Sequence, residues 1–390
     1  MKNRFIFLLL LTLSVIAATL LITNNKYKAI KTMKKNHQTT ELNKEQMPKE
    51  YLDNGIFKDY YKKAYNKLKK MSLEEKISQI LLVRYPEENQ KDIIKKYQFG
   101  GYLFFSKDFK DKTKDNVIKM INDSNEESKI PILTAVDEEG GIVVRVSSNK
   151  NLRNEAFSSS SELYKSGGFD KIREDTKEKS SLLKSLGINL NLAPVVDVST
   201  NPSDYMYKRS LQEDAKITSE FSSLVIETSK NSGVSYTLKH FPGYGNNTDT
   251  HSGSSIDTRT KEEIENNDIL PFKSGIKSGA EAILFSHNIV SSIDDQNPAS
   301  LSKILHDYLR NDLNFSGIII TDDLDMGATK NIENKNVLAL LAGNDLLIST
   351  DYLESIEQIK NAINNKTLDE EVLNKHTLRV LAWKYYKGLL

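Results

Sequence analysis

The sequence predicts an α/β fold: a single (β/α)8 barrel of the TIM type that follows an N-terminal membrane or signal segment. From residue 71 onward, short apolar runs alternate with longer amphipathic runs. Strands that alternate with helices in this way are typical of βαβ units and a parallel sheet. Eight short apolar runs are present, and this number fits a closed barrel better than an open sheet.

The predicted strands are residues 77–83, 101–105, 131–136, 189–193, 234–238, 282–286, 317–321 and 345–349. The predicted helices are residues 113–124, 170–186, 217–232, 264–278, 302–313, 352–364 and 370–389. These elements leave no substantial stretch for a second globular domain. Residues 66–390 are therefore expected to form one barrel domain.

Length and composition limit the classes of protein to which the chain can belong. The chain has 390 residues, of which 38% are hydrophobic and 27% charged, so it can bury a sizeable core. Lys and Arg total 54 against 53 Asp and Glu, and this balance gives no reason to expect nucleic acid as a partner. Cysteine is absent, which excludes disulfides, thiolate metal ligands and a cysteine nucleophile.

Residues 1–25 are predicted to be a signal peptide or a transmembrane anchor. Lys2 and Arg4 precede an uncharged apolar run over residues 5–23, and a run of about 18 residues or more can span a bilayer. The sequence around Ala17 is a poor cleavage site, which slightly favours an anchor. The protein is therefore predicted to be exported, and to be either anchored at the cell-surface membrane or secreted.

Residues 26–65 are polar and rich in lysine and asparagine, and we expect them to form a tether between this segment and the barrel. An ordered helix is the alternative interpretation, and it fits residues 57–70 best.

Charged and polar residues follow several of the predicted strands. In a barrel of this type the active site lies at the carboxyl ends of the strands. Taken singly, each such residue is more simply a strand-end cap or an ion-pair partner, but their joint placement favours a shared site. They are Asp137, Glu138 and Glu139 after the third predicted strand, Asp197 beyond the fourth, Lys239 and His240 after the fifth, His287 after the sixth, and Asp322 and Asp323 after the seventh.

The segment over residues 239–253, KHFPGYGNNTDTHSG, is a candidate catalytic loop. Its glycines, proline and asparagines are typical of a loop at the end of a strand. Asp249 and His251 can point the same way if the segment is extended, and an imidazole oriented by an aspartate can act as a general acid and base. With a second carboxylate at the barrel mouth, this pair fits cleavage of a glycosidic bond. A surface loop with polar side chains is the alternative.

Three motifs, KHFPGYGNNTDTH, DEEGGIVVRV and TDDLDMGA, resemble those of glycoside hydrolase family 3, and specifically its NagZ-type β-N-acetylglucosaminidase branch. The resemblance covers most of residues 70–390, with the motifs in the family's order. It implies a single-domain barrel, a retaining mechanism and a covalent glycosyl–enzyme intermediate. No cofactor and no metal are expected.

The resemblance also implies roles for particular residues. Asp322 resembles the family's nucleophile, with Asp323 as the competing candidate. His251 resembles its acid/base residue and Asp249 the partner of that histidine, while His287 is expected to be structural. The positions that resemble sugar-contacting residues are Asp137, Arg145, Arg209, Lys239 and His240.

Three features depart from the family's pattern. Tyr244 stands where a histidine is more usual, and Ile142 stands where an arginine is common. The stretch between Gly245 and Asp249 is one residue shorter than in many relatives. The nucleophile and the acid/base pair are retained, so an active enzyme is predicted.

The substrate implied by the resemblance is terminal β-linked N-acetylglucosamine in a glycan or a muropeptide of peptidoglycan. We expect a monomer that contacts the membrane through its N-terminal segment and binds no nucleic acid. A catalytically weak, sugar-binding barrel protein of the cell surface is one alternative. A metal hydrolase with His240, Asp249, His251 and His287 as ligands is another, although Lys239 beside His240 would repel a cation.

Overall fold

The protein is described here by a computed structural model that covers residues 28, 47–51, 54–245, 249–250 and 253–390. By its internal contacts the chain divides into two units, Met1–Glu50 and Tyr51–Leu390. The architecture below is that of the second unit.

The predicted membrane or signal segment, residues 1–25, lies outside the described residues. Within the part of the chain that the structure describes, no helix is both long enough and apolar enough to cross a bilayer. Export and membrane anchoring therefore stay predictions.

The last part of the predicted tether belongs to the second unit. The short 3-10 helix η2 (Lys58–Tyr60) leads into α2 (Tyr61–Leu68), which packs against α14 (Glu370–Tyr386). Phe57 is fully buried, and its ring meets the ring of Tyr386 with 5.4 Å between centroids. This part of the chain is helical, as the alternative interpretation of residues 57–70 expects.

Eight parallel strands form one sheet in the order β10-β1-β2-β3-β4-β5-β7-β9. The two ends of this order meet, because Ile320 and Leu346 form a parallel bridge and the Thr321 N–H donates to the Leu346 carbonyl at 3.1 Å. The sheet is thus a nearly closed parallel barrel, which confirms the predicted fold class at this level. The strands are β1 (Leu81–Arg84), β2 (Gly101–Phe104), β3 (Leu133–Val136), β4 (Leu190–Asn191), β5 (Ser235–Phe241), β7 (Ala282–Phe285), β9 (Ile318–Thr321) and β10 (Leu347–Ser349).

The first predicted strand begins too early. Residues 77–79 belong to α3 (Leu73–Gln79), and the strand itself begins at Leu81. A capping box starts this helix: the Ser72 hydroxyl accepts from the Glu75 N–H at 3.2 Å, and the Glu75 carboxylate accepts from the Ser72 N–H at 3.1 Å. The end of the helix and the start of the strand are both buried, so apolar character alone does not separate them.

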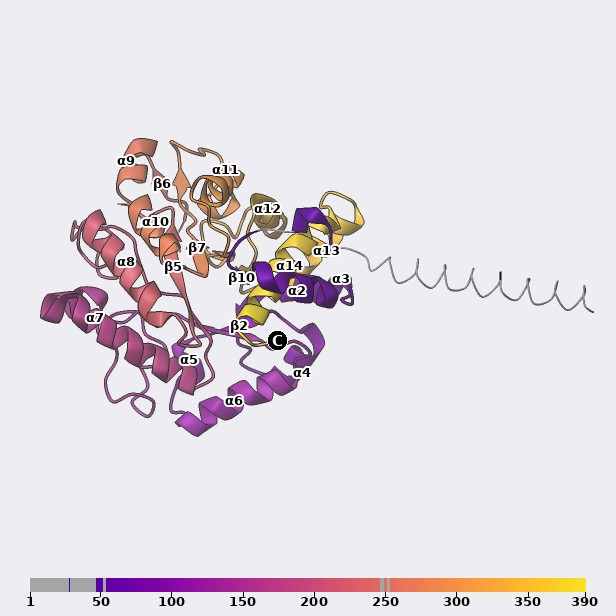
Figure 1. Ribbon diagram of the computed structural model, residues 1–390, viewed down its shortest axis with the longest axis horizontal. Coiled ribbons are helices and arrows are strands. Elements are labelled where there is room, and N and C mark those ends of the chain that lie inside the picture. Colours follow the sequence, from indigo (N-terminus) through magenta and orange to yellow (C-terminus); the bar gives the residue numbers. More distant parts are fainter. Residues whose placement is uncertain (1–27, 29–46, 52–53, 246–248, 251–252) are drawn as a thin grey trace, which may run out of the picture. The chain divides into compact units, whose positions relative to one another are not determined.

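Helices cover the outside of the strands, as α4, α6, α7 and α8 do in Figure 1. With α2, α3 and α14, the helices of the second unit are α4 (Gln90–Tyr97), α5 (Ser106–Phe109), α6 (Lys114–Glu126), α7 (Ser160–Ser185), α8 (Ala215–Ser229), α9 (Lys261–Asn266), α10 (Ile269–Lys277), α11 (Lys303–Asp307), α12 (Lys335–Ala342) and α13 (Tyr352–Asn364). A π-helical turn, Tyr308–Asp312, continues α11.

Two predicted helices differ in more than their end residues. α7 begins ten residues before the predicted start at residue 170, and it is kinked at Gly167 and Gly168, where the backbone leaves helical geometry. The predicted helix over residues 264–278 is instead α9 followed by α10. Pro271 lies in the first turn of α10, where its missing N–H costs no helical hydrogen bond.

A small parallel pair, β6 (Ile256–Asp257) and β8 (Ile289–Val290), lies outside the barrel sheet and was not predicted. Arg259 fixes the segment after β6 by ion pairs to Asp257 at 2.6 Å and to Asp268 at 2.7 Å.

Lys384 of α14 is a fully buried cation. Its Nζ donates to Gln79 Oε1 at 2.8 Å, and no carboxylate among the described residues forms an ion pair with it. Burial, with the ammonium of Lys67 nearby, lowers the pKa of Lys384 from 10.5 to about 7. The folded protein therefore tolerates this charge poorly.

We expect Lys384→Met to stabilise the fold at pH 6. Between about pH 7 and 10.5 the unfolded chain holds a proton on Lys384 that the folded chain lacks, so wild-type stability rises with pH across this window. Methionine removes the cost of burying the charge but leaves Gln79 without its donor, so the expected net gain is about 1–3 kcal/mol. Urea unfolding at pH 6 and pH 9 measures it. An equal gain at both pH values would contradict the lowered pKa.

Candidate active site

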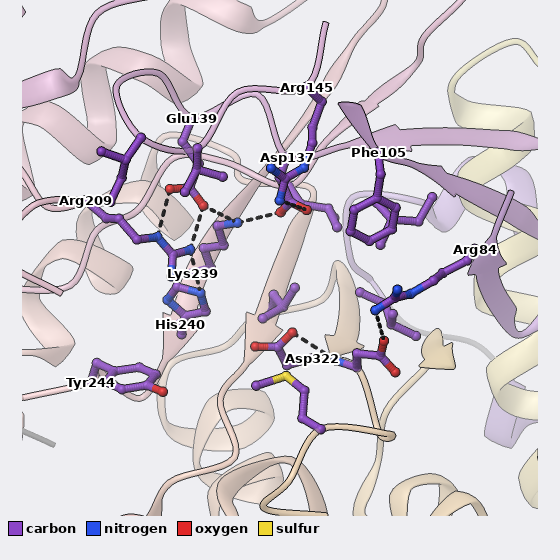
Figure 2. A pocket seen from close by; sticks show the side chains of 18 of the residues that line it. Arg84, Phe105, Asp137, Glu139, Arg145, Arg209, Lys239, His240, Tyr244 and Asp322 are labelled. Carbon is purple, nitrogen blue, oxygen red and sulfur yellow. Dashed lines mark hydrogen bonds and ion pairs between the residues drawn. The ribbon is translucent and has the colours of Figure 1, made fainter. Parts of the chain in front are cut away.

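A cavity of about 310 Å³ lies at the carboxyl ends of the barrel strands. Its lining comes from the end of β1, from the segments after β2, β3, β4 and β9, and from β5 (Figure 2). This is the end of the barrel where the sequence analysis expects the site. The titratable residues of the lining, tyrosines aside, are Arg84, Asp137, Glu139, Arg145, Arg209, Lys239, His240, Asp322 and Asp323.

The structure brings most of the predicted site residues together. Asp249 is described but is not among the lining residues of the cavity, and His251 lies outside the described residues. The assignment of the acid/base pair therefore stays a prediction. The predicted residues that do line the cavity are Asp137, Arg145, Arg209, Lys239, His240 and Asp322.

Lys239 joins two carboxylates in this cavity. Its Nζ lies 2.7 Å from Asp137 Oδ1 and 2.7 Å from Glu139 Oε1 (Figure 2). Arg209 holds Glu139 as well, with its Nη2 2.6 Å from Oε1 and its Nε 3.0 Å from Oε2. Burial acts to raise the pKa of Glu139, but Arg209 and Lys239 outweigh it and hold that pKa well below its usual range. Glu139 is therefore ionised, and its charge is compensated by Arg209 and Lys239.

One carboxylate oxygen of Asp137 is available to a ligand. Its Oδ2 has a long contact, 3.7 Å, to Arg145 Nη2, while its Oδ1 is taken by Lys239. The Nε of Arg145 is buried and makes no hydrogen bond within the described residues. Asp137 and Arg145 both line the cavity, and a carboxylate oxygen and a guanidinium can bind hydroxyl groups.

His240 is oriented by Asp197, which lies in the segment after β4. The imidazole Nδ1 is 2.8 Å from Asp197 Oδ2, and the other carboxylate oxygen accepts the Tyr244 N–H at 2.8 Å. If Nδ1 donates to the carboxylate, Nε2 carries no hydrogen and can accept a hydrogen bond. Nε2 lies 3.5 Å from Arg209 Nη2, and His240 lines the cavity.

Asp322 follows β9 directly and presents its carboxylate to the cavity (Figure 2). Its N–H donates to the Phe285 carbonyl at 3.0 Å, and its Oδ1 accepts the Asp323 N–H at 2.9 Å. Burial acts to raise the pKa of Asp322, but His287, His240, the Asp323 N–H and Lys239 lower it below 3.8. Asp322 is therefore an ionised carboxylate at neutral pH.

Asp323, the competing candidate, has its carboxylate engaged elsewhere. Its Oδ2 accepts the Thr350 hydroxyl at 2.6 Å and a guanidinium hydrogen of Arg84 at 3.4 Å, and its Oδ1 accepts the Asp325 N–H at 3.1 Å. These contacts favour Asp322 as the group that is available to a ligand.

His287 is buried beneath this segment. Its Nδ1 lies 2.7 Å from the Ser300 hydroxyl, and its Nε2 lies 2.9 Å from the Asp323 carbonyl. Both ring nitrogens are thus used to hold protein groups, which supports the structural role expected for His287. Among the residues that the structure describes, no group of three His, Asp or Glu side chains is arranged to hold a metal ion.

Thr250, between the two residues of the predicted acid/base pair, is fastened to the barrel. The Tyr244 hydroxyl lies 2.7 Å from Thr250 Oγ1 and accepts the Thr250 N–H at 3.0 Å. The Thr250 carbonyl accepts the Ala328 N–H at 3.1 Å. Next to it, Asp249 accepts a hydrogen bond from Tyr205, and burial together with this carboxylate raises the pKa of Tyr205. Tyr244 thus anchors Thr250 within the candidate catalytic loop.

Several functional candidates were missed by the sequence analysis. Glu139 and Asp197 were noted only as charges near strand ends, although they position Lys239 and His240. Arg84 was not predicted, although it directly follows the first predicted strand. A charge within four residues of the end of a predicted strand was the available signal for each.

Known proteins resemble this chain in sequence. A model of the glycosyl hydrolase family 3 N terminal domain matches residues 72–383. Over 317 residues the chain is 31% identical to a β-hexosaminidase of Actinobacillus pleuropneumoniae serotype 5b (strain L20), covering 76% of this chain and 88% of that protein. A β-hexosaminidase of Haemophilus influenzae is 31% identical over 281 residues, covering 70% of this chain and 78% of that protein.

Solved structures show the same fold. A glycoside hydrolase family 3 β-N-acetylglucosaminidase from Paenibacillus sp. str. FPU-7 superposes with a TM-score of 0.76 at 24% identity, covering 82% of this chain. The match spans 63% of that chain, less than two thirds of its length. A β-N-acetylhexosaminidase from Beutenbergia cavernae DSM 12333 gives a TM-score of 0.72 at 24% identity, covering 82% of this chain and 99% of that one.

A parallel barrel with carboxylates and cations gathered at the carboxyl ends of its strands has the architecture of a barrel enzyme. The chain belongs to glycosyl hydrolase family 3, which confirms the resemblance inferred from its three motifs. It is a glycoside hydrolase that groups with the β-hexosaminidases of that family.

Tyr244→Phe tests the anchoring of Thr250. The change removes the oxygen that both Thr250 groups bind, at a cost of about 1–2 kcal/mol for the buried polar groups left unpaired. We expect hydrogen exchange of the Thr250 amide to become about tenfold faster, as measured by exchange and mass spectrometry. Tyr205→Phe, which leaves both bonds in place, is the control. Unchanged exchange in Tyr244→Phe would contradict the assignment.

Proposed function

We propose that the protein is a retaining, exo-acting β-N-acetylglucosaminidase that removes terminal β-linked N-acetylglucosamine, with peptidoglycan fragments as its natural substrates. The observation that carries the proposal is Asp322, an ionised carboxylate facing a cavity that is already lined with hydroxyl-binding groups. Relatives described as β-hexosaminidases and as a β-N-acetylglucosaminidase support the acetamido sugar. The predicted export segment supports a substrate in the cell wall.

In the proposed reaction an oxygen of Asp322 attacks the anomeric carbon. The bond from that carbon to the leaving oxygen breaks, and the leaving oxygen takes a proton from His251, which is supported by Asp249. Water then attacks the glycosyl ester and gives a proton to the same imidazole. The free sugar leaves and the Asp322 carboxylate is restored.

The remaining lining residues would bind and orient the sugar. Asp137 offers one uncommitted carboxylate oxygen, and His240 offers Nε2 on an imidazole whose orientation is fixed. Lys239 and Arg209 hold Asp137 and Glu139 at fixed positions, so the site needs little rearrangement when the sugar enters. This preorganisation supports catalysis by positioning.

Asp322→Asn is expected to reduce kcat by about a thousandfold or more on 4-nitrophenyl β-N-acetylglucosaminide, because an amide cannot form the glycosyl ester. The release of 4-nitrophenol is the measurement. Because the pKa of Asp322 is lowered below 3.8, this group stays ionised above about pH 4 and should not limit wild-type kcat/KM there.

The matched control is Asp323→Asn, one residue further along. It makes the same chemical change to a carboxylate that Thr350 and Arg84 already engage, so we expect a much smaller loss. Equal losses in the two variants, or a larger loss in Asp323→Asn, would reverse the assignment of the nucleophile.

His251→Ala tests the acid/base assignment when its activity is compared on two substrates with different leaving groups. 4-Nitrophenol leaves with little help from an acid, whereas a sugar hydroxyl needs a proton. We expect the loss in kcat/KM on a natural β-linked disaccharide to exceed the loss on the 4-nitrophenyl substrate by at least about tenfold. Equal losses on both would indicate that His251 does not donate the proton.

The same assay separates the alternatives. A wild-type protein that hydrolyses neither the β-N-acetylglucosaminide nor the β-glucoside, but binds N-acetylglucosamine, would be the sugar-binding barrel instead. Loss of activity on addition of a chelator would instead support the hypothesis of a metal-dependent hydrolase.

A further inference from the structure

Lys335 is a buried cation outside the cavity, and the proposed mechanism gives it no role. It is the first residue of α12 and is only 2% exposed. Its Nζ lies 2.8 Å from Asp325 Oδ1 and 2.8 Å from Glu354 Oε2. Burial acts to lower the pKa of Lys335, but the two carboxylates outweigh it and raise that pKa above 10.5. A buried ammonium is disfavoured without such partners, so Lys335 and these carboxylates hold one another in place.

The carboxylate of Asp325 binds four donors. Its Oδ1 binds the Lys335 ammonium, and its Oδ2 accepts the N–H groups of Thr350 and Asp351, each at 2.7 Å, and the Ser349 hydroxyl at 3.2 Å. Burial acts to raise the pKa of Asp325, but Lys335 and these N–H groups lower it below 3.8. Asp325 is therefore ionised, and it joins the segment after β9 to the turn between β10 and α13.

The same two segments hold Asp323. The Asp325 N–H donates to Asp323 Oδ1 at 3.1 Å, and the Thr350 hydroxyl donates to Asp323 Oδ2 at 2.6 Å. The Asp323 N–H in turn donates to Asp322 Oδ1 at 2.9 Å. A continuous series of an ion pair and hydrogen bonds thus leads from Lys335, outside the cavity, to a carboxylate oxygen of Asp322, which lines it.

Backbone hydrogen bonds to β7 and β10 fix the start of the segment after β9. The Asp322 N–H donates to the Phe285 carbonyl at 3.0 Å, and the Leu324 N–H donates to the Ile348 carbonyl at 3.0 Å. The side chain of Asp325 fixes the continuation of the segment. A displacement of about 1 Å at a reacting group can lower a rate by about a hundredfold, so these contacts bear on the reactivity of Asp322.

We propose that Lys335 is a positioning residue: through its ion pair with Asp325 it fixes the direction of the Asp322 carboxylate in the cavity. This inference rests on the proposed function, since it takes Asp322 as the nucleophile. The groups proposed to bind the sugar come instead from β5 and from the segments after β3 and β4. Loss of the ion pair should therefore slow the attack on the anomeric carbon without weakening the binding of the sugar.

The test compares Lys335→Met and Asp325→Asn with wild type. The measurements are kcat on 4-nitrophenyl β-N-acetylglucosaminide, the calorimetric affinity for N-acetylglucosamine, and urea unfolding of the full chain, which gives the folded fraction. We expect kcat per folded molecule to fall about tenfold to a hundredfold in both variants, with the affinity unchanged within about twofold. Asp325→Asn keeps the shape of the side chain, so it decides the question if Lys335→Met does not fold.

The matched control is Glu354→Gln, which makes the same change, from carboxylate to amide, at the other partner of Lys335. Glu354 lies on α13, its side chain is 39% exposed, and its Oε1 accepts the Gln358 amide at 2.8 Å. We expect its kcat to stay within about twofold of wild type. Equal losses in Glu354→Gln and Asp325→Asn would overturn the proposal, and so would an unchanged kcat in Asp325→Asn or a parallel loss of kcat and sugar affinity.

Hydrogen exchange separates this inference from the proposed function. Without the ion pair, the Thr350 and Asp351 amides that Asp325 binds should exchange about tenfold faster in both variants, as measured by mass spectrometry. If wild type hydrolyses no β-N-acetylglucosaminide, the proposed function fails, while exchange still decides whether Lys335 holds the segment after β9. If wild type is active and neither exchange nor kcat changes in the variants, only the inference about Lys335 fails.

Discussion

The candidate site depends on one buried cation. Lys239 is only 3% exposed and lies 2.7 Å from both Asp137 and Glu139. An ammonium buried without these partners would be strongly disfavoured, and the two carboxylates without the ammonium would repel each other. Lys239 is therefore held by the two carboxylates and brings them together, although Asp137 and Lys239 are 102 positions apart in the sequence.

The parallel barrel makes this arrangement possible. Strands that all run the same way bring their carboxyl ends to one end of the barrel, so charges that are distant in the sequence meet there. The hydrogen bonds then extend outward from the barrel: Asp197 binds both His240 and the Tyr244 N–H, and the Tyr244 hydroxyl binds Thr250. The candidate catalytic loop is thus tied to the same residues that shape the cavity.

Much of this could be predicted from the sequence, for a physical reason. Buried parallel strands are short apolar runs, and charges directly after them stand out, so the barrel and residues such as Asp137 and Asp322 were predictable. The direction of each side chain after a strand was not predictable, because it depends on the backbone geometry of the loop. Nothing in the sequence shows that Glu139 turns toward Lys239 while Glu138 accepts the Val146 N–H at 2.6 Å in its own loop.

The two candidates for the nucleophile show the same limit, and the structure separates them by their contacts. Asp322 and Asp323 are adjacent and chemically identical, and they differ only in which donors surround them. Asp323 is held by a hydroxyl and a guanidinium, whereas Asp322 faces the cavity. Burial acts to raise the pKa of Asp322, but His287 first, and then His240, the Asp323 N–H and Lys239, lower it. In the proposed mechanism Lys239 thus has two roles, because it fixes Asp137 and also favours the ionised form of Asp322. Replacing Lys239 would therefore act on the chemical step as well as on substrate affinity.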